Sequence, residues 1–597
     1  MADAEYDFIV VGGGTAGCCI AGRLAENPNV SILVIEAGAD NPMDHDKIRI
    51  PGAGFGLIQT GHDWAYESTM VDRDDCRRYE KNTRGRVLGG SSCLNYFAWM
   101  RGCRGTYDEW AQYGGNEWSF DKCLPYFKKG AAFHDEQTAM DLNPEVVGTR
   151  GPLDLMPAIS IPLAGPLRTA WEDRGYPWTE DIFSGDVDGM THVVVAKYRG
   201  VRTNSTVYLE GKSNITIRSR RRSKKIIIED GVAVGVQVQS TNGPETYRAK
   251  HEVIVSQGVY ESPKLLMHSG IGPQQELRKH GIDCIVDSYH VGKNLIDHPV
   301  FPHVVRVKDG NSIDAFIRPG SQHDKAVKQH IESRTGPLCS GLLEIAAFPH
   351  IEDRMKVCRE WREELKRRGH DPLSPTGQPH FELDFIPAFA KPFLPHVQRP
   401  PFGDYLTVVV DLLRPLSRGE VTLKSNDPLD DPAINENFLA HPLDIIGLRE
   451  GIRFTDELLR RGEGMKQIVQ EDYPEPLPLN SDEQMHEVIL KRVTTGYHPC
   501  GTCRLGKNID EGVVDGNLKV YGVKKLRVID ASIDPVIPDC RPQQVVYMTA
   551  EKGSDMIKRE YPSLYPELAS QNGASINYEK KLSKNMHDMM DLTNGNK

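Results

Sequence analysis

The chain has 597 residues, of which 39% are hydrophobic and 26% are charged, and this composition is typical of a folded globular protein rather than a disordered chain. The formal net charge of -11 argues against a nucleic-acid-binding protein, whose contact face is basic, but not against an anionic substrate held by one local arginine. The sequence contains no apolar run of 18 or more residues, so no membrane span is predicted.

The N-terminal residues do not have the pattern of a signal peptide, because acidic residues precede the only apolar run, residues 8–11, and glycines follow it directly. We therefore expect the fold to begin near Tyr6 and the protein to be intracellular and cytoplasmic. Residues 570–597 are polar and charged, and they are predicted to form a C-terminal tail. Their last residues do not match a peroxisomal address of the Ser-Lys-Leu type.

Twelve cysteines are scattered along the chain, and only Cys500 and Cys503 form a C-x-x-C pair. A redox role for this pair needs a helix start in a βαβ unit, and a zinc role needs two further ligands nearby. Reduced cysteines that fill space in an intracellular protein are therefore the prediction, and no metal site is predicted.

The first elements of the chain form a strand, a glycine turn, a helix and a second strand. Residues 7–11 are apolar and predict a strand, and glycines at residues 12–17 follow at once. Residues 18–26 have helical spacing of apolar positions, and residues 31–35 predict a second strand that ends at Glu36. In this context a G-x-G-x-x-G pattern is a strong signal for a dinucleotide-binding unit.

Each part of this pattern has a physical role in holding a dinucleotide. Gly12 permits the tight turn, Gly14 lets a pyrophosphate approach the backbone, and Gly17 lets the helix pack closely on the strand. The helix N-terminus offers free N–H groups to the phosphates. Glu36 lies 19 residues after Gly17, where an acceptor for ribose hydroxyls is expected. The motif alone does not separate NAD from FAD.

Three later segments also lead from an extended or glycine-rich stretch into a loop. Residues 84–95 are rich in glycine and serine and suit a phosphate or the edge of a ring. Residues 253–258 predict a strand that ends in glycine, and a helix is expected to start at Ser262 and Pro263. Residues 526–530 predict a strand that ends in an acid. Together these junctions predict one nucleotide-binding domain assembled from distant segments.

With these segments, the chain resembles the glucose–methanol–choline (GMC) family of FAD-dependent oxidoreductases over about residues 6–560. The resemblance rests on the N-terminal fingerprint, on residues 85–95 and 258–272, and on the C-terminal segments described below. Val259 departs from the family, which usually has a small or hydroxyl residue or proline there, and we expect this to change local packing only. The resemblance implies FAD rather than NAD as the cofactor.

The resemblance also implies an α/β fold with α+β elements. A Rossmann-like FAD-binding domain built from discontinuous segments would be joined to a sheet-and-helix substrate domain that covers the reactive face of the flavin. We assign residues 6–155, 201–300 and 496–565 to the FAD-binding domain, and residues 156–200 and 301–495 to the substrate-binding domain.

Within the second domain, residues 407–413 and 420–423 predict strands, and residues 444–461 predict a helix. The short basic run at residues 220–225 is interpreted as a solvated strand edge rather than a nucleic-acid site.

The family's FAD contacts fall on matching positions of this sequence, in groups that would hold the pyrophosphate, the ribose and adenine, and the flavin. The predicted cofactor-binding residues are Gly12, Gly14, Thr15, Ala16, Gly17, Glu36, Ala37, Trp64, Arg86, Gly90, Asn95, Ala98, Asp530, Ala531, Gln543 and Val545. Some relatives bind FAD covalently through a histidine just before the matching asparagine. Here that position is Leu94, so the resemblance implies non-covalent FAD.

Two residues are predicted to be catalytic. His498, between Tyr497 and Pro499, matches the family's active-site histidine, and histidine exchanges protons near neutral pH. The family's second active-site residue is usually His or Asn and comes 43 positions later; here it is Arg541.

Arg541 bears directly on the identity of the substrate. A permanently charged arginine cannot accept the hydroxyl proton of an alcohol, but its planar fork binds a carboxylate through two hydrogen bonds. Formate is the carboxylate whose carboxyl carbon carries a hydrogen, so loss of hydride gives CO2 with no proton to remove. Arg541 assists the chemical step if it also stabilises charge that arrives on the flavin. His498 then positions the substrate, or supplies positive charge or a proton, rather than acting as a base.

The sequence therefore predicts an FAD-dependent oxidase that converts formate and O2 into CO2 and H2O2, in line with the formate oxidase branch of the family. Asp534 and residues 378–384, 512–515 and 539–541 resemble that branch most closely. The resemblance to this branch also implies 8-formyl FAD as a possible form of the cofactor.

Four alternatives stay open at this point. Arg541 could form a salt bridge with Asp534 or Asp539, or it could bind a larger anionic substrate. The protein could be a GMC alcohol oxidase or dehydrogenase that acts on small primary alcohols, with Arg541 tuning the flavin. It could also keep FAD only as a scaffold, although His498 argues against that.

Overall fold

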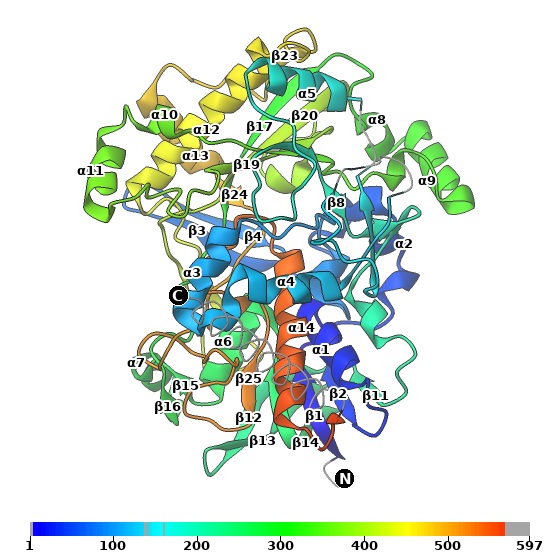
Figure 1. Cartoon of the computed structure of the whole chain (residues 1–597), viewed down its shortest axis with the longest axis vertical. Coiled ribbons are helices and arrows are strands. Elements are labelled where there is room, and N and C mark those ends of the chain that lie inside the picture. The colour runs from blue at the N-terminus through cyan, green and yellow to red at the C-terminus, as the bar shows by residue number, and fades with distance from the viewer. Residues whose placement is uncertain (1–3, 136–139, 141, 159–161, 567–597) are drawn as a thin grey trace, which may run out of the picture.

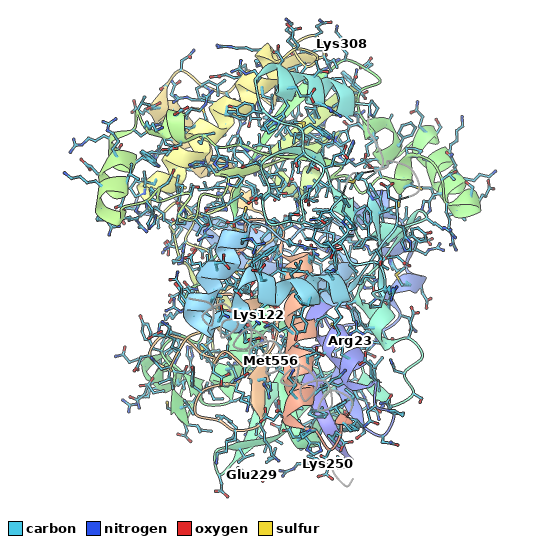
Figure 2. All side chains as sticks on the ribbon, in the orientation of Figure 1. Arg23, Lys122, Glu229, Lys250, Lys308 and Met556 are labelled. Carbon is cyan, nitrogen blue, oxygen red and sulfur yellow. The ribbon has the colours of Figure 1, made fainter. Side chains whose placement is uncertain are left out.

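The computed structural model describes residues 4–135, 140, 142–158 and 162–566, and the predicted tail at residues 570–597 lies outside this part of the chain. Figure 1 shows two large sheets stacked along the long axis of the molecule, with helices packed around both. Figure 2 shows charged side chains such as Lys122, Glu229, Lys250 and Lys308 on the outside of the molecule, where they are exposed to solvent. Across the described residues, no helix is both long and apolar enough to cross a membrane.

The predicted strand–turn–helix–strand unit forms the centre of the lower sheet in Figure 1. Strand β1 (Ala4–Val11) leads through the glycine turn into helix α1 (Thr15–Leu24), and strand β2 (Ile32–Ile35) returns parallel to β1. Residues 8–11 and 32–35 are buried on both faces of the sheet, which is why both strands are continuous apolar runs. These predicted elements are confirmed.

Distant segments complete this sheet. Strands β11 (Ile215–Arg218), β14 (Gly243–Val255) and β25 (Leu526–Val528) join β2 and β1 in the order β11-β2-β1-β14-β25, and all neighbours in this row are parallel. Strands β13 (Val232–Ser240) and β12 (Arg222–Glu229) extend it beside β14 in antiparallel fashion. The predicted Rossmann-like fold built from discontinuous segments is thus confirmed, with the carboxyl ends of its parallel strands at one edge.

Helix α6 (Gly258–His268) begins earlier than the expected start at Ser262, and Pro263 lies inside it. Proline has no N–H, so the carbonyl of Val259, four residues earlier, receives no helical hydrogen bond. The hydroxyl of Thr502 donates to that carbonyl at 2.6 Å instead. A residue far along the chain therefore lets the helix continue through the proline.

The upper sheet in Figure 1 is antiparallel. Its strands run in the order β23 (Val469–Tyr473), β17 (Pro299–Val307), β20 (Asp404–Leu412), β19 (Phe381–Ile386), β18 (Ile345–Phe348) and β7 (Gly189–His192), and the short β24 (Thr494–Thr495) also pairs with β17. Helix α12 (Pro442–Arg461) packs on β20. The predicted strand at residues 407–413 and helix at residues 444–461 are thereby confirmed.

Helix α14 (Gln543–Glu560) runs along the long axis of the molecule in its lower half, and it packs against α1 and α4 (Phe120–Lys129). A four-stranded sheet in the order β21 (Glu420–Thr422), β22 (Ala433–Asn435), β3 (Tyr66–Asp72) and β4 (Arg77–Asn82) combines strands from the segments assigned to the two domains, because β22 pairs with β3. Other helices are α3 (Arg104–Gly114), α5 (Ala164–Asp173), α9 (Ser321–Ser333), α11 (Arg359–Arg368) and α13 (Asp482–Arg492).

Candidate active site

A cavity is lined by segments that follow strands of the lower sheet and by residues of the upper sheet. The glycine turn after β1 lines one part of it, and side chains of β19 and β20 line another. Most of the predicted site residues are brought together here: Gly12, Gly14, Thr15, Ala16, Glu36, Ala37, Trp64, Gly90, Asn95, Ala98, His498, Asp530, Ala531, Arg541 and Gln543.

Three predicted residues lie outside the cavity lining. A Cβ atom on Gly17 would come within 1.8 Å of the Gly12 carbonyl oxygen, so Gly17 serves the close packing of helix on strand. The guanidinium of Arg86 lies over the Trp64 ring, 4.9 Å from its centre. Val545 is fully buried in the first turn of α14, and its neighbour Val546 lines the cavity instead.

The glycine turn leaves room for a ligand at the start of α1. Gly12 has φ +108°, and a Cβ atom there would lie 2.3 Å from the Ser256 carbonyl oxygen, so only glycine fits. Gly14 is the N-cap of α1, and as a glycine it has no side chain that could accept hydrogen bonds from the first N–H groups of the helix. A Cβ atom on Gly14 would meet nothing closer than the Cα of Gly90, at 3.9 Å. Gly14, Thr15 and Ala16 line the cavity, so the start of α1 is placed to offer its free N–H groups to a pyrophosphate.

Glu36 closes the end of β2. Its two carboxylate oxygens accept hydrogen bonds from the backbone N–H groups of Gly13 at 3.1 Å and Gly38 at 2.7 Å. Burial raises the pKa of Glu36 to about 7, although these two bonds favour the ionised form. Each carboxylate oxygen keeps a second acceptor position, so Glu36 can also accept from ribose hydroxyls.

Asp530 ties the end of β25 to the start of α6. Its carboxylate accepts from the N–H of Gly258 at 2.8 Å and from the hydroxyl of Ser262 at 2.6 Å. The other carboxylate oxygen accepts from the N–H of Ser532 at 2.8 Å. Asp530 therefore ties two segments from distant parts of the chain together at the cavity edge.

The donor set and the shape of the cavity fit FAD. The glycine turn, the acceptor Glu36 and the aromatic ring of Trp64 suit the adenosine diphosphate part. Trp64 stacks on Tyr66 with the ring planes 11° apart, which fixes its orientation. At the other part of the cavity, the amide of Asn95 contacts that of Gln543, and its oxygen accepts from Arg202 at 2.8 Å.

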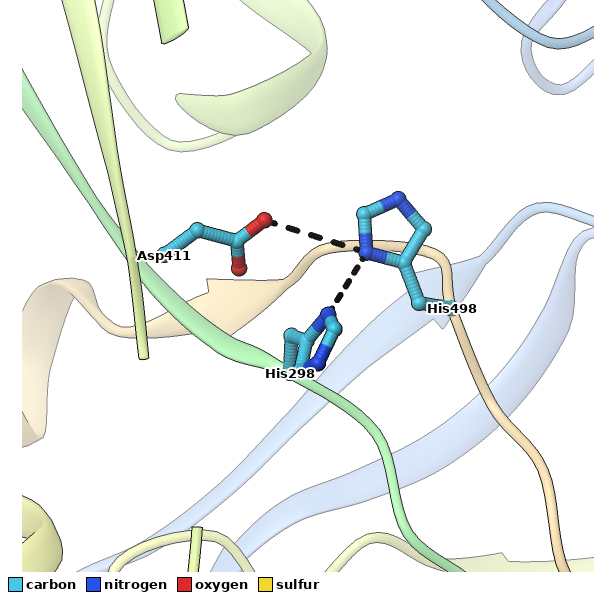
Figure 3. A group of neighbouring side chains, drawn as sticks. All are labelled: His298, Asp411 and His498. Carbon is cyan, nitrogen blue, oxygen red and sulfur yellow. Dashed lines mark hydrogen bonds and ion pairs between the residues drawn. The ribbon is translucent and has the colours of Figure 1, made fainter. Parts of the chain in front are cut away.

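His498 is held by a chain of hydrogen bonds (Figure 3). Nε2 of His298 lies 3.0 Å from the Leu413 carbonyl oxygen, which can only accept, so this nitrogen carries a proton. Nδ1 of neutral His298 is then a bare acceptor, and it lies 3.0 Å from Nδ1 of His498. Nδ1 of His498 must therefore donate, which leaves Nε2 of His498 without a proton.

The loop that carries His498 is fixed by Asp297. The carboxylate of Asp297 accepts from the N–H of His498 at 2.8 Å and from the hydroxyl of Thr495. Burial, and then the neighbouring ring of His298, hold the pKa of His498 well below its ordinary value. In this environment His498 is neutral.

Arg541 is buried beside acidic side chains of β19. It is 6% exposed, and its Nη2 lies 3.1 Å from Glu382 and also contacts Asp384. Nη1 lies 3.7 Å from the sulfur of Met100. Burial lowers the pKa of Arg541, and the charge of Glu382 opposes that change. An arginine nonetheless stays protonated throughout the ordinary pH range.

The salt bridges considered for Arg541 in the sequence are not the ones formed. Asp539 pairs with Arg414 at 3.3 Å and accepts from the hydroxyl of Thr106. Asp534 is buried, and its carboxylate has no hydrogen-bond partner among the described residues. The acids that contact Arg541 come from the opposite sheet, which the spacing along the chain did not indicate.

Sequence reasoning did not single out His298 or Asp411, and it used Glu382 and Asp384 only as part of the resemblance at residues 378–384, without a role at the site. Asp411 on β20 lies directly opposite Glu382 on β19, and its Oδ2 is 3.8 Å from Nδ1 of His498. Glu382 and Asp384 alternate with apolar residues in a buried strand, and Asp411 interrupts another apolar strand. Acidic residues within apolar strands were the available signal, because burying a carboxylate costs free energy unless the group is paired, protonated or bound to a ligand.

Comparisons with known proteins give a consistent result. Two family models described as GMC oxidoreductase match residues 6–300 and 415–550. "Dehydrogenase pkfF" of Emericella nidulans is 31% identical over 594 residues, covering 93% of this chain and 94% of that protein. "Oxygen-dependent choline dehydrogenase" of Chromohalobacter salexigens is 32% identical over 574 residues, covering 94% of this chain and 96% of that protein.

Solved structures with a higher sequence identity to this chain are described as formate oxidase. A structure of Aspergillus oryzae RIB40 formate oxidase, which describes the effect of an arginine mutation on FAD modification, is 50% identical with a TM-score of 0.93. It covers 95% of this chain and 100% of that chain. A second structure, a crystal structure analysis of formate oxidase, matches with the same identity, TM-score and coverage.

Proposed function

The chain belongs to the GMC oxidoreductase family and is an FAD-dependent oxidoreductase, and we propose that it is a formate oxidase, which converts formate and O2 into CO2 and H2O2. The observation that carries this proposal is Arg541, a buried guanidinium that lines the cavity together with His498. The 50% identity to formate oxidase structures supports it.

The proposed reaction requires the protein mainly to bind formate and FAD and to balance the negative charge of formate. FAD, when bound, supplies the acceptor for hydride and the route of electrons to O2. Arg541 holds the carboxylate, and a charge-assisted hydrogen bond of this kind contributes about 1.5–3 kcal/mol. Formate has no hydroxyl proton to lose, so a positively charged residue in this place does not impair the reaction as it would for an alcohol.

His498 has a different role from that of a base. Its neutral ring lines the cavity, with Nδ1 held by His298 and the backbone held by Asp297. We assign it to positioning the bound anion and to handling the proton that the overall reaction consumes. Because both the ring and the backbone of His498 are held, little entropy is lost in orienting the side chain during each turnover.

We also propose that the predicted cofactor contacts bind FAD and that the chain is divided into the FAD-binding and substrate-binding domains assigned above. FAD would be held by the cavity-lining residues of the predicted set, without a covalent bond, because Leu94 offers no nucleophile where some relatives have histidine. An 8-formyl group on the flavin is part of the proposal through the formate oxidase relatives, whose description mentions FAD modification.

The proposal is tested by product analysis on the purified holoenzyme. With ¹³C-formate and air we expect equimolar O2 consumption, ¹³CO2 and H2O2. Methanol, ethanol and glycolate are the comparison substrates, and each is expected to be turned over at least about a hundredfold more slowly, because none presents a hydride donor at a carboxyl carbon held by Arg541. Equal or faster turnover of an alcohol would contradict the proposal.

One observation favours an alcohol oxidase or dehydrogenase as the second candidate. Nε2 of His498 is unprotonated and can accept the hydroxyl proton of a small primary alcohol. Choline and pyranose dehydrogenases are also among the relatives at 31–32% identity. In that case Arg541 would act on the flavin rather than on the substrate, and the same product analysis separates the two functions.

A further inference from the structure

Three carboxyl groups lie on one face of the upper sheet, next to a single guanidinium. Glu382 and Asp384 are two residues apart on β19 and so share a face, and Asp411 on β20 is opposite Glu382 in the ladder. Glu382 is 0% exposed and Asp411 is 1% exposed. Among the described residues, none forms a hydrogen bond to either oxygen of Glu382 or to Oδ1 of Asp411, although Nη2 of Arg541 forms an ion pair with Glu382 at 3.1 Å.

The charges of this group do not balance. If all three acids were ionised, they would exceed the charge of Arg541 by two in a buried region, and buried like charges this close do not ionise together. Nε of Arg541 is also buried without a hydrogen-bond partner in the described chain, and the side chain lines the cavity. One ionised carboxylate is enough to balance Arg541, so an anion that binds there brings one uncompensated negative charge unless that carboxylate takes up a proton.

We propose that a small anion binds at Arg541 together with about one proton, which the facing carboxyl groups of Glu382 and Asp411 take up. Protonation of this pair frees the charge of Arg541 for the anion. The inference rests on the proposed function, because it takes formate as the natural anion. It goes beyond that function in assigning a place where formate and a proton enter the site together.

The overall reaction consumes one proton, and the proton taken up with the anion can supply it. The balance is HCOO⁻ + H⁺ + O2 → CO2 + H2O2, in which the C–H bond of formate breaks, carbon loses two electrons and O2 gains them. One hydrogen of the peroxide comes from formate, and the other is the proton taken up with the anion. Asp411, with its Oδ2 at 3.8 Å from Nδ1 of His498, places this proton beside the residue that we assign to handling it.

Groups on every neighbouring segment act on this pair. Burial, then Glu382 and Asp297, raise the pKa of Asp411 well above its ordinary value, and burial raises the pKa of Glu382 against the charge of Arg541. The facing groups are Asp384 on β19, Cys540 and Arg541 before α14, Asp297 and His298 before β17, and His498 after β24.

The test uses azide, a small monoanion that cannot donate hydride, on the oxidised holoenzyme. Calorimetry in two buffers of different ionisation enthalpy gives the number of protons taken up, and perturbation of the flavin spectrum gives Kd between pH 6 and 9. We expect an uptake of about one proton and a Kd that rises about tenfold per pH unit. Arg541→Met should abolish azide binding.

Matched variants assign the proton. Glu382→Gln and Asp411→Asn keep the shape of each side chain but cannot ionise, and each should bring the uptake toward zero and flatten the pH dependence of Kd. Glu344→Gln is the control, because burial raises the pKa of Glu344 to about 7 but it lies by Lys197 rather than Arg541. This control should keep the proton uptake of the wild type.

Several results would overturn the inference: no azide binding at any pH, a Kd independent of pH in the wild type, or uptake that persists in both variants and is lost in His498→Gln. The wild-type measurement does not depend on the folding of any variant. Azide binding with proton uptake but no formate turnover would leave this inference standing and refute the proposed function. Formate turnover without proton uptake would do the reverse.

Discussion

Nδ1 of His298 lies 3.0 Å from Nδ1 of His498, and the only consistent assignment of protons makes His298 the acceptor. The two rings are nearly perpendicular, with planes 82° apart. Burial lowers the pKa of His298 to about 3, so this ring stays neutral and keeps its acceptor throughout the range in which the enzyme would work. His298 is therefore a positioning residue that fixes the tautomer of His498.

Substitution of His298 tests this role. Asn places an acceptor oxygen near the position of Nδ1, whereas Leu removes the acceptor, and both leave the Leu413 carbonyl without its donor. We expect His298→Leu to lower kcat/KM by about a hundredfold and His298→Asn to keep most of it. The pH profile of kcat/KM should shift in the Leu variant only, because only there does the tautomer of His498 change. Equal losses and unshifted profiles in both variants would reduce His298 to a packing residue.

Arg541→Met should remove formate turnover while the flavin stays bound. The guanidinium fork gives two charge-assisted bonds, so we expect kcat/KM to fall by at least about a hundredfold. Arg541→Lys keeps the charge but loses the fork, and an intermediate value is expected. Steady-state O2 consumption with formate measures the effect, and the visible flavin spectrum is the control for cofactor content. A Met variant with the kcat/KM of the wild type would remove Arg541 from the mechanism.

Glu436 is expected to make stability depend on pH. Its Oε1 accepts from the hydroxyl of Tyr260 at 2.6 Å and from the amide of Asn82 at 3.0 Å, and burial, then Asp297, raise its pKa to about 8. A raised carboxyl pKa contributes stability below the unfolded value, about 4.3, that is lost as pH rises through the folded value. Glu436→Gln keeps the acceptor oxygen and removes the titration.

The variant should therefore gain stability over the wild type at pH 9 but not at pH 5. We expect a difference of a few degrees in Tm at the higher pH, measured by differential scanning calorimetry of the holoenzyme. Glu210→Gln, at an exposed position, is the control and should behave as the wild type at both values. The same Tm change for Glu436→Gln at both pH values would refute the titration.

The flavin should leave the protein on denaturation. Leu94 lines the cavity and is buried, and leucine cannot form a covalent link to the flavin. After acid precipitation we expect the yellow cofactor in the supernatant and a polypeptide mass equal to that of the unmodified chain. Yellow colour that stays with the pellet, with a matching increase in mass, would contradict non-covalent binding.

The local part of the fold was predictable from the sequence, because β1, the glycine turn, α1 and β2 follow one another within 36 residues. The early start of α6 was not, because it depends on a hydrogen bond between Thr502 and Val259, 243 residues apart. A proline signals a helix boundary unless a distant group satisfies the freed carbonyl.

The candidate site was predictable to the same limited extent. His498 and Arg541 stand out by resemblance to a family, and most predicted cofactor residues line one cavity. The groups that set their chemistry do not stand out, since His298 is 200 residues from His498 and the pairing of Glu382 with Asp411 depends on the register of β19 and β20. The register of two strands is a property of the folded sheet and cannot be read from the sequence of either strand alone.

Formate is expected to reduce the bound flavin directly. The most direct measurement is the visible spectrum of the purified holoenzyme mixed with formate without oxygen and then opened to air. If formate is the substrate, the flavin band bleaches with formate and returns in air, and H2O2 forms in the same amount as the flavin that was reduced. A band that stays unchanged with formate but bleaches with methanol or a larger alcohol would contradict this expectation.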